Sequence, residues 1–222
     1  PGQVHADAVI LAVPARPASR LLADVPGASA AITAFGQIHY ASMAIVTLAY
    51  PRSAFPAPGL AGLGWSGYLV PAVDGRVVKA VTFSTVKWPH LAAASAPGDE
   101  ALEIVRCSVG RIGEEGLLQR ADDDLAALAA DELAAATGVR GGPVATRVTR
   151  WGGALPQYTV GHLDRVAAIR AAVAAQPGLA VCGAAYDGVG IPACVATARA
   201  AASQVLAFLA GRPPADDAGA AR

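Results

Sequence analysis

Towards its end the chain reads Leu179-Ala-Val-Cys-Gly-Ala-Ala-Tyr-Asp-Gly-Val-Gly-Ile-Pro-Ala-Cys-Val195. The apolar run Leu179–Cys182 follows a Pro-Gly pair, and this pattern predicts a short buried strand. The loop behind it is rich in glycine, which permits tight turns and a close backbone approach. Its glycines are Gly183, Gly188 and Gly190. Pro192 suits the first turn of a helix, so the stretch predicts a strand, a glycine-rich loop and a helix N-terminus.

Such a helix N-terminus has a definite chemical character. Its first N–H groups have no partner within the helix, and the helix dipole places a partial positive charge there. It can hold a phosphate, a carbonyl group or the electron-rich edge of a reduced flavin ring. Ordinary connections in α/β folds have the same pattern, so the motif alone leaves both interpretations open.

The composition argues against several classes of function. Lys+Arg and Asp+Glu each number 17 in 222 residues, and this balance does not favour nucleic acid or an anionic membrane as a partner. The cysteines and histidines have no spacing typical of a disulfide framework or a metal site. They are Cys107, Cys182, Cys194, His5, His39, His90 and His162. We therefore expect no bound metal and a cytoplasmic location.

No uninterrupted apolar run reaches the roughly 20 residues that a membrane-spanning helix needs. The nearest is 193–210, which Arg199, Ser203 and Gln204 interrupt. We therefore expect a packed amphipathic helix here, no transmembrane segment and no signal peptide.

The alternation of apolar and polar residues predicts the order of the elements. Strands are expected over Asp7–Pro14, Ile38–Tyr50, Trp65–Pro71, Arg76–Ser84, Pro143–Trp151 and Leu179–Cys182. Helices are expected over Ala15–Leu22, Ala28–Phe35, Pro97–Glu115, Asp122–Thr137, Gly161–Ala175 and Pro192–Ala210. The turn Ala72-Val-Asp-Gly75 should join two of the strands in a hairpin.

This order predicts an α/β fold, α+β within this stretch, with two domains. Residues 1–30 and 152–211 would form part of one α/β domain, and residues 31–151 an inserted domain with a mixed or antiparallel sheet. Residues 212–222 are expected to be a disordered tail. Since the chain begins at Pro1 and its single methionine is Met43, we expect it to be the C-terminal part of a larger protein.

Four blocks, in matching order, resemble the oxygen-dependent protoporphyrinogen/coproporphyrinogen oxidases. Gly183–Cys194 is similar to the family's C-terminal flavin signature, and Leu155-Pro-Gln-Tyr-Thr-Val-Gly-His162 to a second family block. The other two are Asp7–Pro14, which resembles the strand that closes the flavin domain, and Gly67–Pro71 with Val81–Ser84 and Lys87–Pro89, which looks like the substrate domain. The blocks are spread over nearly the whole chain.

The resemblance implies a flavoenzyme of haem biosynthesis. Its fold would be the C-terminal part of a p-hydroxybenzoate-hydroxylase-like FAD domain with an inserted substrate-binding domain. It would oxidise a porphyrinogen to the porphyrin with non-covalently bound FAD, using O2 as acceptor and producing H2O2. The alanine-rich composition and the lack of a membrane-binding segment resemble soluble members, so coproporphyrinogen III is expected rather than protoporphyrinogen IX.

The resemblance also implies which residues form the site. The flavin contacts fall on Ala184, Val189, Gly190 and Ile191, and the wall of the macrocycle pocket includes Gly67 and Leu69. Small residues would let the backbone approach the flavin ring, and N–H groups would favour its reduced form. No residue is assigned a catalytic role. Gly190 as a plain turn glycine and Leu69 as ordinary core stay open, and His162 is expected to be a hydrogen-bonded structural residue.

One family feature is missing from the sequence. The glycine-rich loop that holds the FAD pyrophosphate is absent, as are the family's N-terminal basic substrate residues. The chain is therefore expected to need the N-terminal half of the same protein as a partner. Two alternatives stay open: another amine-oxidase-like flavoprotein, such as a desaturase or amine oxidase, and a non-catalytic fragment.

Overall fold

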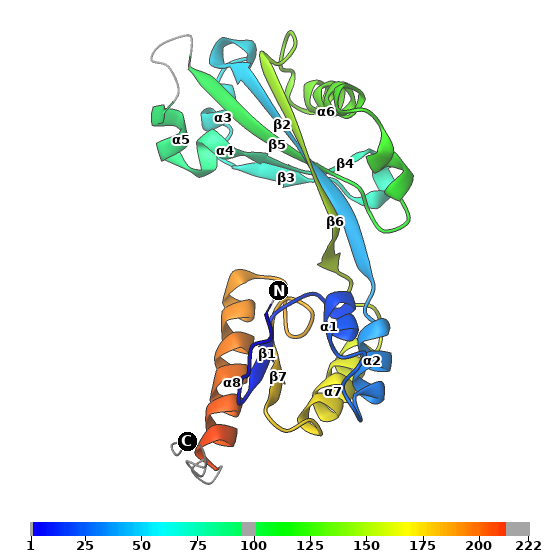
Figure 1. The fold of residues 1–222 in the computed structure, drawn as a ribbon. Coiled ribbons are helices and arrows are strands. Elements are labelled where there is room, and N and C mark those ends of the chain that lie inside the picture. The colour runs from blue at the N-terminus through cyan, green and yellow to red at the C-terminus, as the bar shows by residue number, and fades with distance from the viewer. Residues whose placement is uncertain (1, 95–100, 212–222) are drawn as a thin grey trace. The chain divides into compact units, whose positions relative to one another are not determined.

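The computed structural model describes residues 2–94 and 101–211, which form two compact units (Figure 1). Unit 1 comprises residues 1–39 and 156–222, and unit 2 comprises residues 40–155. The boundaries expected from the sequence, at 30/31 and 151/152, fall inside a helix and a strand. The unit boundaries instead follow the ends of these elements, because a helix that packs along one face stays with the core it covers. The expected tail at 212–222 lies outside the described residues.

Unit 1 is built on a two-stranded parallel sheet of β1 (Val9–Leu11) and β7 (Leu179–Val181). Its helices are α1 (Ala15–Leu21), α2 (Ser29–Gly36), α7 (His162–Ala174) and α8 (Ile191–Ala210). Helix α8 packs against both strands, whereas α7 packs against β7 and α2. Figure 1 shows α8 on one side of the sheet and α1, α2 and α7 on the other. The strand–loop–helix expected at the end of the chain is therefore confirmed.

Strand β1 is less buried than its apolar sequence predicts. Leu11 is buried, but Val9 and Ile10 are exposed. Within the described residues β1 has β7 as its one pairing partner, so its other edge is uncovered. The uninterrupted apolar run in Asp7–Pro14 predicts a strand buried on both faces, and this prediction is wrong for the described part of the chain.

Helix α8 meets the length and composition of a membrane-crossing helix, in contrast to the sequence expectation. Arg199 is the single charged residue among the 20 residues of the helix. One charge is too few to exclude the helix from the composition range of membrane-spanning helices. In unit 1 the helix buries Thr197 and Ala201, and most of its other described side chains are exposed or partly exposed. Length and composition alone are weak grounds for a membrane span, since core helices share them.

Unit 2 is a five-stranded sheet in the order β3-β4-β5-β2-β6. The strands are β2 (Tyr40–Pro51), β3 (Gly67–Leu69), β4 (Val78–Phe83), β5 (Leu102–Val109) and β6 (Ala145–Pro156). The pairs β3–β4, β4–β5 and β5–β2 are antiparallel. Short helices connect them: η1 (Arg52–Ala54), α3 (Gly59–Gly62), η2 (Ala72–Asp74), α4 (Ser84–Lys87), α5 (Pro89–Ala94) and η4 (Glu115–Gln119). The expected hairpin around Gly75 is confirmed.

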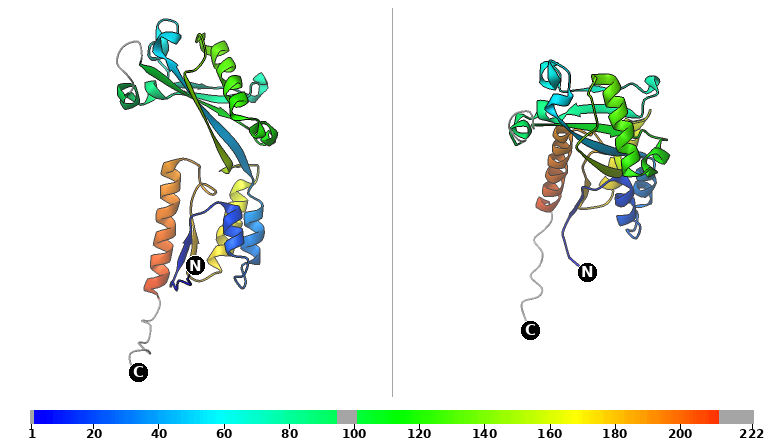
Figure 2. Two further views of the ribbon diagram at one scale, coloured as in Figure 1. Left: turned by 45° about the horizontal axis from the view of Figure 1, so that its top comes forward. Right: turned by 90° about the horizontal axis from the view of Figure 1, so that it is seen from above.

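Helix α6 (Asp122–Thr137) covers one face of this sheet, as Figure 2 shows. Three aspartates in its first turn favour the positive end of the helix dipole, and Gly138 ends the helix in a left-handed conformation. Its buried side chains pack against Val46, Leu48, Val105 and Cys107 of the central strands. This helix has the bounds that the sequence predicts, and its face of the sheet holds the core of unit 2.

The helix expected over residues 97–115 is wrong. Residues 102–109 form β5, the middle strand of the sheet, and residues 97–100 lie outside the described residues. Val105, Cys107 and Val109 are buried at every second position and join the core, which is the period of a strand. The spacing of Ala101, Ile104 and Val105 also fits a helix, so the local pattern was ambiguous and pairing with β2 and β4 settled it.

Candidate functional site

The glycine-rich loop of unit 1 joins β7 to α8. Gly188 has φ +148°, and a Cβ atom there would lie 2.8 Å from the Cβ of Ala193, so the loop requires glycine at this position. Gly190, the N-cap of α8, has φ −71° and ψ 149°, which any residue adopts. A Cβ on Gly190 would meet only the Cδ of Pro192, at 3.8 Å. Neither strain nor packing within the described chain therefore explains the glycine at 190.

Hydrogen bonds from both sides fix the loop. The hydroxyl of Thr197 accepts from the N–H of Gly183 at 3.0 Å and donates to the carbonyl of Cys194 at 2.9 Å. The hydroxyl of Tyr158 donates to the carbonyl oxygen of Ala184 at 2.5 Å. The Nε2 atom of His162 lies 2.9 Å from the carbonyl oxygen of Tyr186. The loop is thus preorganised, and the expected structural role of His162 is confirmed.

The first amides of α8 follow directly on this fixed loop. The N–H groups of Gly190 and Ile191 donate to no acceptor in residues 2–94 and 101–211. Val189 and Ile191 beside them are 50% and 80% exposed. Unpaired amides at the positive end of a 20-residue helix form a site for a carbonyl oxygen or an anion. Of the expected flavin residues, Val189, Gly190 and Ile191 gather at this helix end, and Ala184 lies in the same loop.

The buried cysteines are not nucleophiles. Burial raises the pKa of the Cys107 thiol to about 12, and burial together with nearby Cys194 raises that of Cys182. Both stay protonated and inert near neutral pH. In the part of the chain that the structure describes, no group of three or more His, Cys, Asp and Glu side chains could hold a metal ion.

The expected substrate residues Gly67 and Leu69 lie together on β3 of unit 2. Gly67 has φ +152°, and a Cβ there would lie 2.2 Å from the carbonyl oxygen of Val81. Glycine is therefore needed for the pairing of β3 with β4. Leu69 is 82% exposed, so it is not an ordinary core residue. Its side chain belongs to the sheet face that α6 does not cover.

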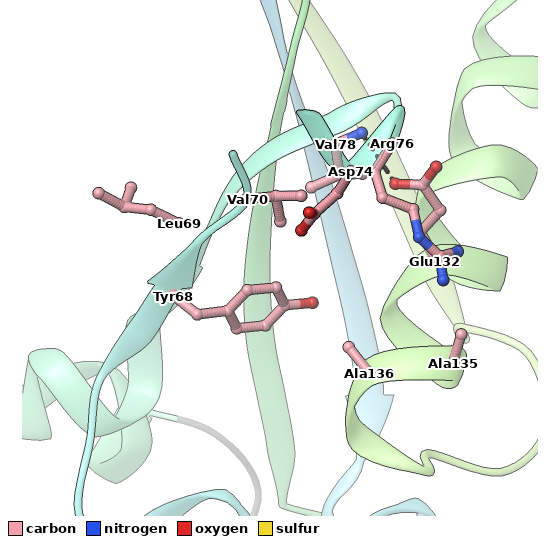
Figure 3. Close-up of a pocket in the computed structure, with 9 residues that line it drawn as sticks. All are labelled: Tyr68, Leu69, Val70, Asp74, Arg76, Val78, Glu132, Ala135 and Ala136. Carbon is pink, nitrogen blue, oxygen red and sulfur yellow. Dashed lines mark hydrogen bonds between the residues drawn. The ribbon is translucent and has the colours of Figure 1, made fainter. Parts of the chain in front are cut away.

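The other face of β3 borders a cavity of about 250 Å³ beneath α6. Figure 3 shows Tyr68 pointing towards α6 and Leu69 pointing away from it. The two oxygens of Glu132 accept hydrogen bonds from the N–H groups of Val77 and Val78, at 2.9 Å each. Burial raises the pKa of Tyr68 to about 12. This cavity is a polar seam between β4 and α6, and Leu69, although it lines the cavity, directs its side chain away from α6.

Two arginines that the sequence patterns did not indicate lie on the same sheet face as Leu69. They are Arg106 on β5 and Arg147 on β6, both exposed. Arg106 escaped notice because its segment was expected to be a helix. The signal that could have found it is a single charge in the apolar run Ile104-Val-Arg-Cys-Ser-Val109.

Comparisons with known proteins show the family of the chain. Residues 1–206 match the family described as flavin containing amine oxidoreductase. The chain belongs to this family. Membership of this family supports a flavin as the class of cofactor, and the α/β fold class expected from the sequence is confirmed.

Among its relatives are proteins named coproporphyrinogen III oxidase. That of Mycobacterium tuberculosis (strain ATCC 25618 / H37Rv) is 44% identical over 209 residues, which cover 94% of this chain and 42% of the relative. That of Bacillus subtilis (strain 168) is 32% identical over 207 residues, covering 93% and 41%. This chain therefore spans about two fifths of the length of the curated relatives it matches.

Solved structures of the same fold extend the comparison. A protein from Exiguobacterium sp. 255-15, proposed to be a protoporphyrinogen oxidase, is 30% identical with a TM-score of 0.72 and covers 91% of this chain and 42% of its own. Cyclohexylamine oxidase from Brevibacterium oxydans IH-35A is 14% identical with a TM-score of 0.61, covering 91% and 43%. At that identity the likeness of the amine oxidase shows the fold alone.

Proposed function

We propose that the protein containing this chain is an FAD-dependent porphyrinogen oxidase of haem biosynthesis. Its substrate is coproporphyrinogen III, with protoporphyrinogen IX as the second choice, and O2 is the acceptor that is reduced to H2O2. The observation that carries the proposal is the 44% identity to a coproporphyrinogen III oxidase over 94% of this chain. That similarity runs through both units rather than through a single motif.

Unit 1 supplies part of the FAD site in this proposal. The N–H groups of Gly190 and Ile191 have no acceptor among the described residues, and the open space at Gly190 admits a close neighbour. Residues Ala184, Val189, Gly190 and Ile191 would hold the flavin ring. When bound, FAD supplies the oxidising chemistry by taking electrons from the substrate. The fixed amides stabilise negative charge that develops beside them without having to reorient.

Unit 2 supplies the substrate surface. A tetrapyrrole needs a broad, mostly apolar wall with few polar anchors. The exposed side chain of Leu69 and the close backbone approach at Gly67 give such a wall on the face of the sheet away from α6. The core of unit 2 lies on the face of the sheet that α6 covers. This core holds the strands in place, so the opposite face, which would contact the substrate, is rigid although its own side chains are not part of the core.

The remaining three fifths of the protein would supply the rest of the FAD site. The relatives are more than twice as long as this chain, and the exposed Val9 and Ile10 give β1 an apolar surface for further chain to cover. We assign the glycine-rich pyrophosphate loop to that N-terminal part, and the complete enzyme to the cytoplasm.

The rival activity is that of an amine oxidase or desaturase. The likeness to cyclohexylamine oxidase rests on 14% identity, against 44% for the coproporphyrinogen III oxidase. The sequence similarity therefore favours porphyrinogen. A non-catalytic fragment is the other alternative, and flavin absorbance in the purified full-length protein would argue against it.

The test is an assay of the full-length protein with coproporphyrinogen III and protoporphyrinogen IX in air. We expect an increase in porphyrin fluorescence with parallel H2O2 formation, faster with coproporphyrinogen III. Cyclohexylamine and putrescine serve as the control substrates, and neither should bleach the flavin. Failure to oxidise either porphyrinogen would overturn the proposal.

A further inference from the structure

The uncovered face of the unit 2 sheet, here called the open face, has a defined set of side chains. Val46, Val81 and Cys107 point into the core beneath α6. Successive side chains of a strand alternate between faces, so Thr47, Thr82 and Arg106 belong to the open face. The strand register aligns them, since Thr82 pairs with Arg106 and Arg106 with Thr47.

This row of residues runs directly into the expected substrate wall. Thr82 also pairs with Gly67, so Gly67, Thr82, Arg106 and Thr47 lie side by side across four strands. The next row on the same face contains Leu69 with Ala80 and Ser108. Arg106 therefore lies among small and apolar residues, two strands away from β3.

A second arginine lies on the same face. Val148 packs against the core of unit 2, and the Nε of Arg150 donates to the carbonyl oxygen of Leu118 at 2.8 Å on the α6 side. Alternation then places Arg147 on the open face. Because β5 and β6 flank β2, the two arginine-bearing strands are separated by two strand spacings, about 10 Å.

Neither arginine is neutralised within the described residues. Arg106 and Arg147 are exposed, and they form no ion pair or side-chain hydrogen bond within residues 2–94 and 101–211. Glu103 is the one acidic residue in the five strands. It pairs with Arg52, with a nitrogen–oxygen distance of 3.0 Å, and its alternation with Val105 and Cys107 puts it on the covered face. Arg106 and Arg147 therefore lie on the open face, whereas the one acid of the five strands lies on the covered face.

We propose that Arg106 and Arg147 form a two-point carboxylate subsite that selects a porphyrinogen by its propionate groups. This inference rests on the function proposed above. Guanidinium groups bind carboxylates bidentately and are weakly hydrated, which suits them to a partly apolar surface. Coproporphyrinogen carries more propionates than protoporphyrinogen, in which vinyl groups replace some of them. The subsite thereby favours coproporphyrinogen, and the hydroxyls of Thr47 and Thr82 flank it as further donors.

The experiment compares Arg106→Gln and Arg147→Gln with the wild type in the full-length protein. The readouts are kcat/KM for the two porphyrinogens and the binding of coproporphyrin III and protoporphyrin IX, followed by fluorescence. Each substitution should lower kcat/KM for coproporphyrinogen about tenfold to a hundredfold, mainly through KM, as expected for loss of a charge-assisted hydrogen bond. The kcat/KM for protoporphyrinogen should decrease less, so the preference of the enzyme for coproporphyrinogen over protoporphyrinogen should decrease.

Matched variants separate this role from a structural one. Arg106→Lys should restore part of the selectivity because it keeps the charge. Arg140→Gln removes an exposed arginine outside the five strands and should leave the selectivity unchanged. An unchanged melting temperature in all variants shows that the fold is intact, as expected for side chains that have no ion pair or hydrogen bond within the described residues.

The outcomes distinguish this inference from the proposed function. If the wild type oxidises porphyrinogens but both glutamine variants keep its selectivity within about twofold, the subsite is overturned and the function stands. If the wild type oxidises neither yet binds coproporphyrin through these arginines, the function is overturned and the subsite stands. Equal binding of the two porphyrins by the wild type would also overturn the subsite.

Discussion

The side chain of His162 is bonded to the backbone of Tyr186, with 2.9 Å between its Nε2 and the carbonyl oxygen. The ring also stacks on that of Tyr158, with ring centroids 3.8 Å apart. Tyr158 in turn holds the carbonyl of Ala184. Tyr158, before α7, and His162, at its start, therefore hold the glycine-rich loop at two carbonyls. The amides of Gly190 and Ile191 at the other end of the loop have no acceptor within the described residues.

His162→Ala is expected to loosen this grip. It removes the partner of a buried carbonyl and a buried ring, and the loss of a hydrogen bond of this kind destabilises by about 1–3 kcal/mol. Urea unfolding of the full-length protein should show that decrease, and the variant should release flavin more readily. His90→Ala, which removes an exposed histidine on α5, is the matched control and should match the wild type. Equal flavin retention in both variants would contradict the role of His162.

Two glycines of the loop should respond oppositely to a side chain. Gly188→Ala places a Cβ 2.8 Å from that of Ala193 at φ +148°, and the strain should destabilise the protein by about 1–3 kcal/mol. Gly190→Ser keeps an allowed backbone and adds a preferred N-cap, so thermal stability should be kept or raised.

The same Gly190→Ser variant should bind flavin more weakly, because its hydroxyl fills the open space and competes for the amides of α8. The measurement is flavin affinity by fluorescence alongside the melting temperature. Weaker binding at unchanged stability separates a binding role of Gly190 from a plain turn role. Unchanged affinity would leave Gly190 as a turn residue.

Local sequence patterns were sufficient where an element depends mainly on its own residues. The three aspartates and the terminal Gly138 predicted both ends of α6, and the Asp-Gly pair predicted the β3–β4 hairpin. The helices of unit 1 and its strand–loop–helix at β7 and α8 also lie close to where they were expected. In each case the turn or cap chemistry is contained within a few neighbouring residues.

Local patterns failed where partners distant in sequence decide the outcome. β5 is a strand because it pairs with β2 and β4. Its β-branched residues favour a strand, whereas the spacing of Ala101, Ile104 and Val105 also fits a helix. The requirement for glycine at 67 arises from the backbone of Val81. The open face became visible only through the register of three strands, so Arg106 could not be linked to Leu69 from the sequence.

Cys107 should make the protein sensitive to alkali. Burial raises its pKa from the ordinary 9.0 to about 12 in the folded state. The folded protein then binds the thiol proton more tightly than the unfolded chain, so its contribution is complete below pH about 9 and is lost as the pH rises towards about 12. Urea unfolding of Cys107→Val across this range should show a smaller loss of stability than the wild type.

The alkaline slope should not vanish in that variant, because burial raises the pKa of Tyr68 to about 12 as well. Tyr68→Phe tests this second contribution. The two substitutions together should make the free energy of unfolding depend still less on pH in the alkaline range. Parallel pH profiles for the wild type and Cys107→Val would contradict the assignment.

Glu132 should hold the irregular start of β4 against α6. Its two oxygens accept from the N–H groups of Val77 and Val78 at 2.9 Å, next to the register shift between Val78 and Ala80. Glu132→Gln keeps the size but turns one acceptor into a donor that faces an N–H group, and this should destabilise by about 1–3 kcal/mol. Asp131→Asn, one position away on the exposed side of α6, is the control and should change stability by less than about 0.5 kcal/mol.

Amide hydrogen exchange at Val77 and Val78 measures the effect directly, and faster exchange in Glu132→Gln alone is the expected result. Equal exchange in the two variants would show that the β4 bulge is held by the sheet itself rather than by the helix.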